Sequence, residues 1–487
     1  MTDLGCVGES FLHTSTTTAL PGNVLLEIFD FYRNNHDYTC HGVWKWHLLV
    51  HVCQRWRQVV FTSPHRLKLQ LLCTFGTPVR KNLGIWPTFP IAVDYFSYPE
   101  RGLTHIDEDS IIAALEHPNR VCYVNLYITS LQLGKVATAM QESFPVLKYL
   151  RISLEDRNAP VLPAEFLGGC APYLREVTLS GIPYPTLPTL LLSASHLVTL
   201  SLRYIPSTGF ISPESLFVGL AALPKLECFI LRFQSVSEPS SIEQSPSPLE
   251  TRTALPALTS FEFRGASEYL EVLATLIDSP QLHNISIVYL DERVYFQVDQ
   301  LSKFISRSIG PRLALFQHAQ ITLFQDRPGI TFDMCPSPNH PFSYVPPVRA
   351  RVSIEEFDWR VNRLAHVLSQ CTVALSNVVH LKIMTEPSSP DSSCNIEWTY
   401  DTRWTCDVEW RRLFRQLLAV ETLHVSWDLA ECIASALEDS ISEETAAVDA
   451  LPSLNLICLA GQPASSIEQF VTARRLSGRP VTVINAE

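Results

Sequence analysis

The chain lacks several features that would assign it to a familiar class of protein. Its 13 cysteines contain no C-x-x-C pair, so we expect reduced, mostly buried thiols rather than a disulfide framework. No stretch approaches the ~18–20 uninterrupted apolar residues of a membrane span, and the best one, Leu187–Leu202, is broken by Pro188 and His196. The first twenty residues contain no Lys or Arg, so no secretory signal is expected. These absences predict a cytoplasmic or nuclear protein that does not enter a membrane.

The sequence is also poor in motifs for catalysis. It holds only 18 glycines, and it contains no G-x-S-x-G, phosphate-binding loop, H-E-x-x-H or G-x-G-x-x-G pattern. His47 and His51 have a spacing that suits a metal, but they share the polar face of a predicted helix, where solvated histidine is expected. We therefore predict neither an enzyme nor a bound cofactor or metal. A hydrolase site built from irregular loops after residue 300 is the alternative.

Basic residues are outnumbered by acidic ones. Lys and Arg total 37 against 49 Asp and Glu, which gives a formal net charge of −12. This balance argues against nonspecific binding to nucleic acid, although it leaves room for a local basic patch. Hydrophobic residues make up 46% of the chain, which is enough to bury a core, so wholesale disorder is excluded.

Residues 1–19 are small and polar and predict a frayed tail, after which two helical patterns follow. The first begins near Asn23, a suitable N-cap, and its predicted apolar face comprises Val24, Leu25, Ile28, Phe29 and Tyr32. The second begins near Trp46 and ends before Ser63-Pro64. Its predicted apolar face comprises Leu48, Leu49, Val52, Cys53, Trp56, Val59 and Val60. The polar stretch Arg33–Gly42 between them predicts a loop.

From residue 121 the pattern apolar-x-x-apolar-x-apolar recurs about every 23 to 32 residues, which is typical of leucine-rich repeats. The clear copies are Val121/Val124/Leu126, Leu147/Leu150/Ile152, Leu174/Val177/Leu179, Leu197/Leu200/Leu202, Leu226/Phe229/Leu231, Leu258/Phe261/Phe263 and Leu282/Ile285/Ile287. The weaker and less regular copies are Val378/Leu381/Ile383, Val420/Leu423/Val425 and Leu454/Ile457/Leu459. The last two apolar positions of each copy point to one side of a short strand, so the strands must stack to bury them.

The turns of this array are expected to be irregular. The family usually has Asn or Cys three residues after each copy, but those positions hold Thr129, Glu155, Ile182, Ile205, Gln234, Ala266 and Leu290. An unrelated α/β array is the alternative. Ser- and Pro-rich composition predicts mobile loops near 235–247, 336–347 and 386–394. The predicted organisation is a tail over 1–19, a helical domain over 20–67 and a solenoid over 68–487.

The N-terminal helices resemble an F-box over about residues 20–67. The resemblance rests on Leu20-Pro21, on Ile28-Phe29 in the first helix and on Val52-Cys53-x-x-Trp56 in the second. The run Trp46–Arg57 looks like the F-box proteins expanded in mushroom-forming fungi, although the insertion Phe31–Trp46 is longer than the loop usual in the family. The resemblance implies a small N-terminal helical F-box, and together with the repeat pattern this predicts an α/β fold class in which the F-box is followed by an irregular leucine-rich-repeat-like solenoid.

The F-box resemblance also implies a partner, the Skp-family adaptor of cullin-based ubiquitin ligases. By that similarity, the residues that face the adaptor or support its binding face are Leu20, Pro21, Leu25, Ile28, Leu48, Val52 and Trp56. A size argument points the same way, because fewer than ~50 residues in two or three helices cannot enclose a sufficient core. Leu26, Val50 and Phe61 fall off the main apolar faces, so part of this surface is expected to meet another body. A cap of the solenoid that buries these side chains internally is the alternative.

The repeat array suggests a surface for a client protein. Three successive repeats place an arginine directly after the third apolar position: Arg203, Arg232 and Arg264. Equal positions of stacked strands lie ~4.8 Å apart, so we predict a guanidinium column on the concave sheet that receives an acidic or phosphorylated client segment. Alternatively, Glu176 and Glu262 on the same surface could neutralise these arginines within the chain. Three tyrosines are further candidate client contacts: Tyr123, Tyr127 and Tyr149.

The function predicted from the sequence is that of a substrate-recognition subunit. The F-box would bind the adaptor and, through it, cullin, while the repeat body holds an unidentified client near the ubiquitin-charged enzyme. An F-box scaffold that works outside ubiquitination is the alternative. Neither nucleic acid nor a membrane is expected as a partner.

Overall fold

The computed structural model describes most of the chain. The described residues are 20–35, 46–64, 66–85, 89–96, 102–156, 160–235, 252–290, 299–308, 316–324, 330–335, 349–354, 376–386, 407–442, 450–460 and 465–486. They belong to two compact units, residues 1–128 and 129–487, so the boundary predicted between residues 67 and 68 lies inside the first unit. The predicted tail over 1–19 and the loops near 235–247, 336–347 and 386–394 lie outside the described residues, except for Ser235 and Glu386.

Three helices open the first unit: α1 (Gly22–Asn35), α2 (His47–Val50) and α3 (Gln54–Thr62). The prediction of a single helix from Trp46 to Thr62 is therefore wrong, because the helix is interrupted at residues 51–53. Cys53 is extended (φ −158°), and its Sγ accepts a hydrogen bond from the Trp56 backbone N–H at 3.4 Å. This N-cap replaces backbone bonds that a continuous helix would make there. The predicted loop also starts later, since α1 continues to Asn35.

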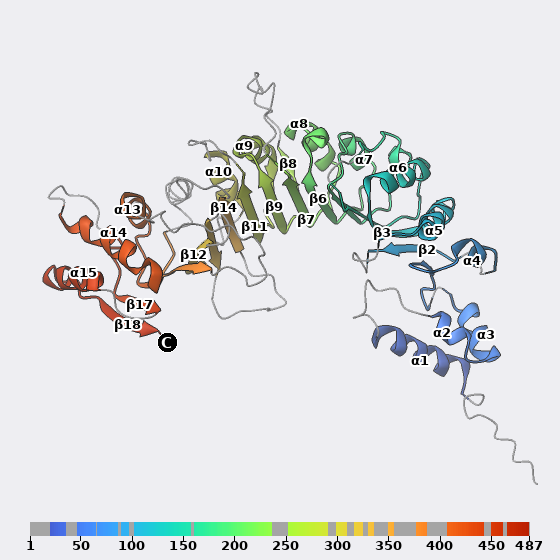
Figure 1. The fold of residues 1–487 in the computed structure, drawn as a ribbon, viewed down its shortest axis with the longest axis horizontal. Helices are drawn as coiled ribbons and strands as arrows, with labels where there is room; N and C mark the ends of the chain where they lie inside the picture. Colours follow the sequence, from blue (N-terminus) through green and yellow to red (C-terminus); the bar gives the residue numbers. More distant parts are fainter. Residues whose placement is uncertain are drawn as a thin grey trace, which may run out of the picture. The chain divides into compact units, whose positions relative to one another are not determined.

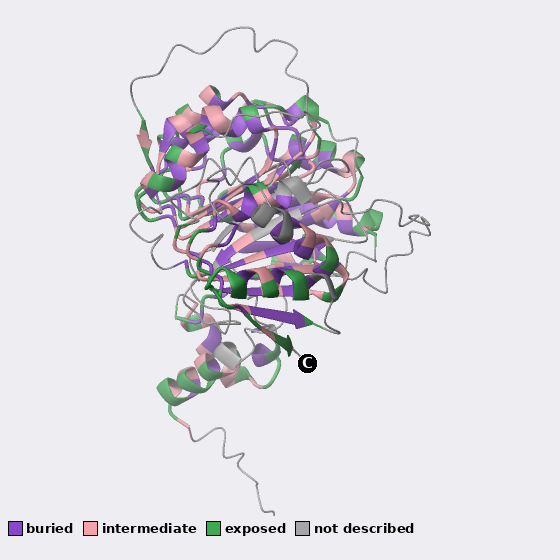
Figure 2. Ribbon diagram, turned by 90° about the vertical axis from the view of Figure 1, so that its left-hand side faces the viewer, coloured by how far each residue is buried: buried purple, intermediate pink, exposed green. Residues whose placement is uncertain are grey.

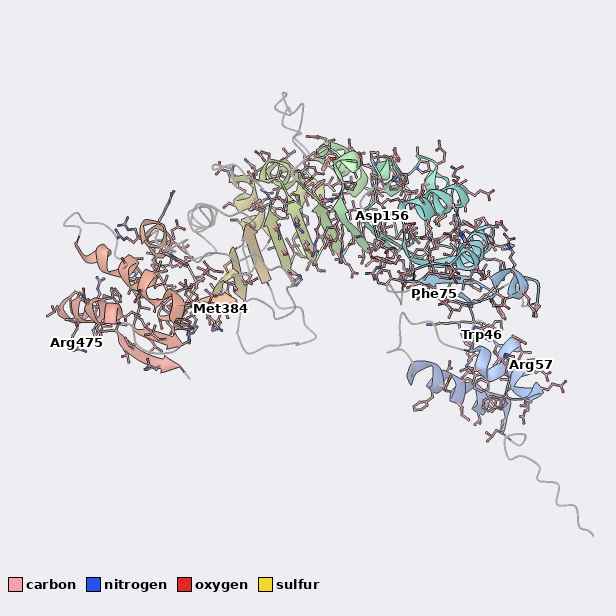
Figure 3. All side chains as sticks on the ribbon, in the orientation of Figure 1. Trp46, Arg57, Phe75, Asp156, Met384 and Arg475 are labelled. Carbon is pink, nitrogen blue, oxygen red and sulfur yellow. The ribbon has the colours of Figure 1, made fainter. Side chains whose placement is uncertain are left out.

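The three helices, here called the helical head (residues 20–35 and 46–64), share a core with the residues that follow them. The buried members of this core are Leu25, Phe29, Trp46, Leu49, Val50, Val60, Leu67, Leu69 and Phe89. Phe89 packs edge-on against Trp46 with ring centroids 5.5 Å apart, and it lies 6.1 Å from Phe61. The Trp46 indole, labelled in Figure 3, donates to the backbone carbonyl of Gln70. The head is thus completed by residues 67–89, beyond the domain end predicted at residue 67.

The rest of the first unit alternates strands and helices: β1 (Leu71–Cys73), α4 (Val79–Ile85), β2 (Ile91–Tyr95), α5 (His105–Leu115) and β3 (Val121–Ile128). The three strands are parallel, in the order β1-β2-β3. A capping box begins α5, since the Asp107 backbone N–H donates to Thr104 Oγ1 and the Thr104 N–H donates to the Asp107 carboxylate. A carboxylate in this first turn also interacts favourably with the helix dipole.

The second unit begins with repeated strand-and-helix segments whose helices lie along one side of the sheet (Figure 1). The elements are α6 (Ser130–Ala139), β4 (Tyr149–Leu154), η2 (Phe166–Gly169), β5 (Glu176–Ser180), α7 (Leu187–Leu191), β6 (Thr199–Ile205), η3 (Ser207–Gly209), α8 (Pro213–Leu220), β7 (Cys228–Phe233), β8 (Thr253–Ala254), β9 (Ser260–Gly265), α9 (Ser267–Leu276), β10 (Ile277–Asp278), β11 (Asn284–Tyr289) and α10 (Asp299–Ser308). Strands β4, β5, β6, β7, β9 and β11 are adjacent and parallel in that order.

An antiparallel meander interrupts the array before parallel pairing resumes. The elements are β12 (His318–Phe324), β13 (Ile330–Cys335), β14 (Arg349–Ile354), β15 (His380–Glu386), α13 (Asp407–Phe414), β16 (Thr422–Ser426), η5 (Trp427–Leu429), α14 (Ala430–Ser442), β17 (Leu456–Ala460), α15 (Ser465–Leu476) and β18 (Thr482–Ala486). The order is β11-β14-β13-β12-β15-β16-β17-β18, and only β13 is antiparallel to its neighbours among these described strands. The sequence pattern did not predict this insertion.

The predicted repeat pattern is confirmed in all ten copies. Every apolar position of the pattern is buried, with at most 3% of its surface exposed. The register aligns equal positions, as in the series Leu150, Val177, Leu200, Phe229, Phe261 and Ile285. Figure 2 colours these buried strand residues purple. The chain therefore carries leucine-rich-repeat-like stacking of an α/β type.

The turns are irregular, as the missing Asn or Cys predicts. The repeat after β4 has the short 3₁₀ segment η2, whereas α-helices follow β3, β5, β6, β9 and β11, and Leu167 within η2 has a positive φ of 58°. Thr129 caps α6 in a capping box with Gln132, which satisfies backbone groups that a side-chain ladder would otherwise serve.

Candidate interaction surfaces

Helix α1 exposes an apolar stripe beside its buried face. Val24, Ile28 and Phe31 are spaced i, i+4 and i+7 and are 37%, 42% and 68% exposed. Leu25 and Phe29, one residue further along in each turn, are fully buried in the core of the head. The single apolar face predicted for this helix is therefore two stripes, one buried in the core of the head and one exposed.

The break between α2 and α3 exposes two more apolar side chains. Leu48 and Val52 are 48% and 57% exposed, whereas Leu49 and Val50 turn into the core. The prediction of one continuous apolar face from Leu48 to Val60 is therefore wrong. The turn at residues 51–53 separates α2 from α3, so the helical spacing does not continue from one helix to the other. Together with the α1 stripe these residues form what we call the head patch: Val24, Ile28, Phe31, Leu48 and Val52.

The structure divides the predicted adaptor-binding residues into two groups. Pro21, Ile28, Leu48 and Val52 are exposed, so they are accessible to a partner. The other three support the head from inside or from its edge: Leu25 is buried, and Leu20 and Trp56 pack partly buried against the core. The Trp56 ring packs edge-on against Phe29 with centroids 4.9 Å apart.

Three residues expected to supply surplus apolar surface do not do so. Val50 is 1% exposed, and Leu26 and Phe61 pack against the core of the head. The expectation failed because Phe61 meets Phe89, which is distant in sequence. Val24 and Phe31 expose apolar surface instead, and their i, i+7 spacing with Ile28 was the sequence signal for this stripe.

In the second unit, the strand face opposite the buried apolar positions is here called the open face. Arg232 and Arg264 are register partners on it, as predicted. On the other side of Arg232, a bulge in β6 sets both Arg203 and Tyr204 opposite it, so Arg203 lies beside Arg232 without a one-to-one register partner. Tyr204 takes a positive φ of 52° there and is 46% exposed.

The positive charge of the predicted guanidinium column is partly neutralised within the chain. Arg232 forms an ion pair with Glu262, which is the alternative that the sequence left open. Arg203 Nε donates to Ser201 Oγ at 3.0 Å, within its own strand. Arg232 and Arg203 thus have different local partners, so the arginines do not form one uniform row.

The predicted client-binding tyrosines belong to different units. Tyr123 and Tyr127 are half-buried on β3 of the first unit, where the Tyr127 ring packs edge-on against Phe96 at 5.9 Å. Tyr149 begins β4 in the second unit and is 39% exposed.

A cluster of histidines and a lysine occupies the open face near the C-terminal end of the array, and the sequence reasoning missed it. His318 on β12 is the register partner of His380 on β15, and their rings stack with centroids 4.5 Å apart at 13°. Lys382 on β15 is the register partner of His424 on β16. Burial and the neighbouring His380 lower the pKa of His318; burial, Lys382 and His380 lower the pKa of His424.

Metal and membrane features were sought in the described part of the chain. There, no group of three or more His, Cys, Asp or Glu side chains is placed to hold a metal ion. Among the same residues, no helix has the length and apolar character needed to span a membrane.

Comparisons with known proteins give little further identification. No family model matches the chain, and no curated protein matches it. Among solved structures, it is similar to the leucine-rich repeat-containing protein LegL7 from Legionella pneumophila, with 12% identity over 85% of this chain and 99% of that chain. The TM-score of 0.27 is too low for this likeness to support an argument about fold or function.

Proposed function

We propose that the chain is the substrate-recognition subunit of a Skp–cullin–F-box type ubiquitin ligase. In this proposal the helical head is the F-box and binds the Skp-family adaptor through the head patch. The second unit holds a client protein on its open face, and the covalent chemistry is done by other subunits. Catalysis within this chain forms no part of the proposal.

The observation that supports the proposal best is the head patch itself. The core of the head is closed by Leu67, Leu69 and Phe89, whereas Val24, Ile28 and Phe31 remain exposed outside it. Exposed apolar stripes of this kind mark interaction sites when they are not part of a core. Their location on the segment that resembles an F-box favours the Skp-family adaptor as the partner.

The test uses the full-length chain and the purified Skp-family adaptor of the same organism, with affinity measured by isothermal titration calorimetry. Ile28→Asp should weaken binding ~30-fold or more, because an anchoring residue contributes about 2 kcal/mol and a charge there is desolvated. Ile106→Asp is the matched control: Ile106 is 72% exposed in the first turn of α5, in the same unit. The control should bind like the wild type.

Equal affinity for Ile28→Asp and Ile106→Asp, or no binding by the wild type, would remove the proposed adaptor role. Addition of cullin to the wild-type complex then separates the ligase from a scaffold. Co-elution of cullin with chain and adaptor supports the ligase, whereas a complex that excludes cullin supports the scaffold.

A further inference from the structure

The histidine and lysine cluster on the open face carries an inference about the client. Strands β12, β15 and β16 are adjacent and parallel, so the side chains of His318, His380, Lys382 and His424 occupy neighbouring positions on one face. Met384, labelled in Figure 3, follows on the same face of β15. Three half-buried imidazoles and one exposed ammonium group thus lie within two strand spacings. We call these four residues the His/Lys patch.

In the register of the described strands, no acidic residue is directly opposite a member of this patch. Asp333 on β13 is opposite Gln320 on β12, which places it diagonal to His318 at ~8 Å and two strands, ~10 Å, from Lys382. Glu386 ends β15, four residues or ~13 Å beyond Lys382.

Two further titratable groups lie on neighbouring elements. Cys458 on β17 pairs with His424 in register, and burial raises the pKa of its thiol, so it is uncharged. Asp428 lies on η5, beyond the end of β16. The shifts in the pKa of His318 and His424 come from burial and from other cationic groups of the patch.

The chemistry of the patch favours an anion over a metal ion. Lys382 lies beside His424 and lowers the pKa of that imidazole, so a divalent cation would be repelled there. A carboxylate would instead accept hydrogen bonds from the ammonium group and from protonated imidazoles, and it would relieve their mutual repulsion.

We propose that the His/Lys patch binds an Asp- and Glu-rich segment of the client protein, and that this binding tightens as the pH falls from 7.5 to 6. The proposal rests on the proposed function, which assigns client binding to the open face. Burial and the neighbouring cationic groups lower the pKa of His318 and His424, which favours their neutral forms at pH 7.5. A bound carboxylate favours protonated imidazoles, so binding takes up protons and strengthens at lower pH.

The experiment titrates the full-length chain with a fluorescein-labelled octaglutamate peptide and follows fluorescence anisotropy. Each imidazole that gains a proton on binding contributes up to ~10-fold in affinity per pH unit, so we expect at least ~10-fold tighter binding at pH 6.0 than at pH 7.5. Lys382→Gln should weaken binding ~5-fold or more, as expected for loss of one cationic partner. Lys225→Gln, at an exposed lysine between α8 and β7, is the matched control and should bind like the wild type.

Substitutions of the imidazoles test the pH dependence. His380→Gln should flatten it, and His424→Gln provides the same measurement if the first variant does not fold. His196→Gln, at an exposed histidine in the turn before β6, should keep it.

Several outcomes would overturn the assignment. They are binding of octaglutamine as tight as octaglutamate, equal affinities at the two pH values, or equal effects of Lys382→Gln and Lys225→Gln. Binding of a phosphoserine peptide without binding of octaglutamate would assign the patch to phosphate, and saturable Zn²⁺ binding lost in His380→Gln would assign it to a metal. Adaptor affinity, measured on the same preparations, reports on the head patch separately, so failure of one proposal is distinguishable from failure of the other.

Discussion

Replacing Phe89 by alanine should unfold the helical head selectively. Phe89 is 6% exposed, lies outside the segment that resembles an F-box, and contacts Trp46 and Phe61 through its ring. Truncating a buried Phe costs about 3–5 kcal/mol, of which the aromatic pairs account for about 0.5–1.5 kcal/mol each. Phe31→Ala is the matched control, because Phe31 is 68% exposed on the same head. Removing the same atoms there should cost less than about 0.5 kcal/mol.

The assay is hydrogen exchange of the full-length chain followed by mass spectrometry of peptides from residues 20–35. A loss of about 3 kcal/mol lowers the protection of the slowest amides ~10²-fold, and a loss of 5 kcal/mol lowers it more than 10³-fold. Peptides from β5 to β9 in the second unit should keep their protection. If Phe89→Ala and Phe31→Ala exchange alike in α1, the head does not depend on residues 67–89 and the reasoning is refuted.

Two glycines of the second unit should respond oppositely to alanine. A Cβ on Gly209 would lie 2.6 Å from the Pro183 backbone, so Gly209→Ala should lower the free energy of unfolding by about 1–3 kcal/mol. Gly134 lies on α6, where an added Cβ would meet open space, so Gly134→Ala should raise the free energy of unfolding by about 0.5–1 kcal/mol. Calorimetry that shows shifts of the same sign for the two variants would contradict this. Burial raises the pKa of the Cys73 thiol to about 12, so iodoacetamide at pH 8 should label the exposed Cys170 much faster than Cys73. Comparable labelling rates by mass spectrometry would contradict the burial of Cys73.

The core of the repeats was predictable because it follows from spacing alone. Two apolar residues two positions apart must point to the same side of a strand, so Leu200 and Leu202 could be assigned to the core without a tertiary model. The same rule held for the weaker copy at Leu423 and Val425, after the interruption by β12 to β14. Those three strands were missed, since antiparallel pairing across an insertion has no fixed period in the sequence.

The candidate surfaces were less predictable because they depend on local exceptions and distant contacts. Cys53 caps the start of α3 a few residues after α2 ends, and the break between the two helices leaves Val52 exposed. Arg203 loses one-to-one pairing with Arg232 because Tyr204, beside it in the bulge, adopts a conformation that sequence patterns assign to glycine. The His/Lys patch was missed for another reason: His318 and His380 become neighbours only through the order of the strands.

The two proposed surfaces lie on different compact units, and this has a consequence for the mechanism. Ile28 belongs to the first unit and Lys382 to the second. Substitutions at the two sites should therefore act independently, and each should weaken only the binding of its own partner. A proximity mechanism nevertheless requires both surfaces to be occupied together, because only then does the client's local concentration near the ligase rise. The double variant Ile28→Asp/Lys382→Gln should therefore show, in each binding assay, the same loss as the corresponding single variant, whereas ubiquitination of an acidic client should already fail in Ile28→Asp alone.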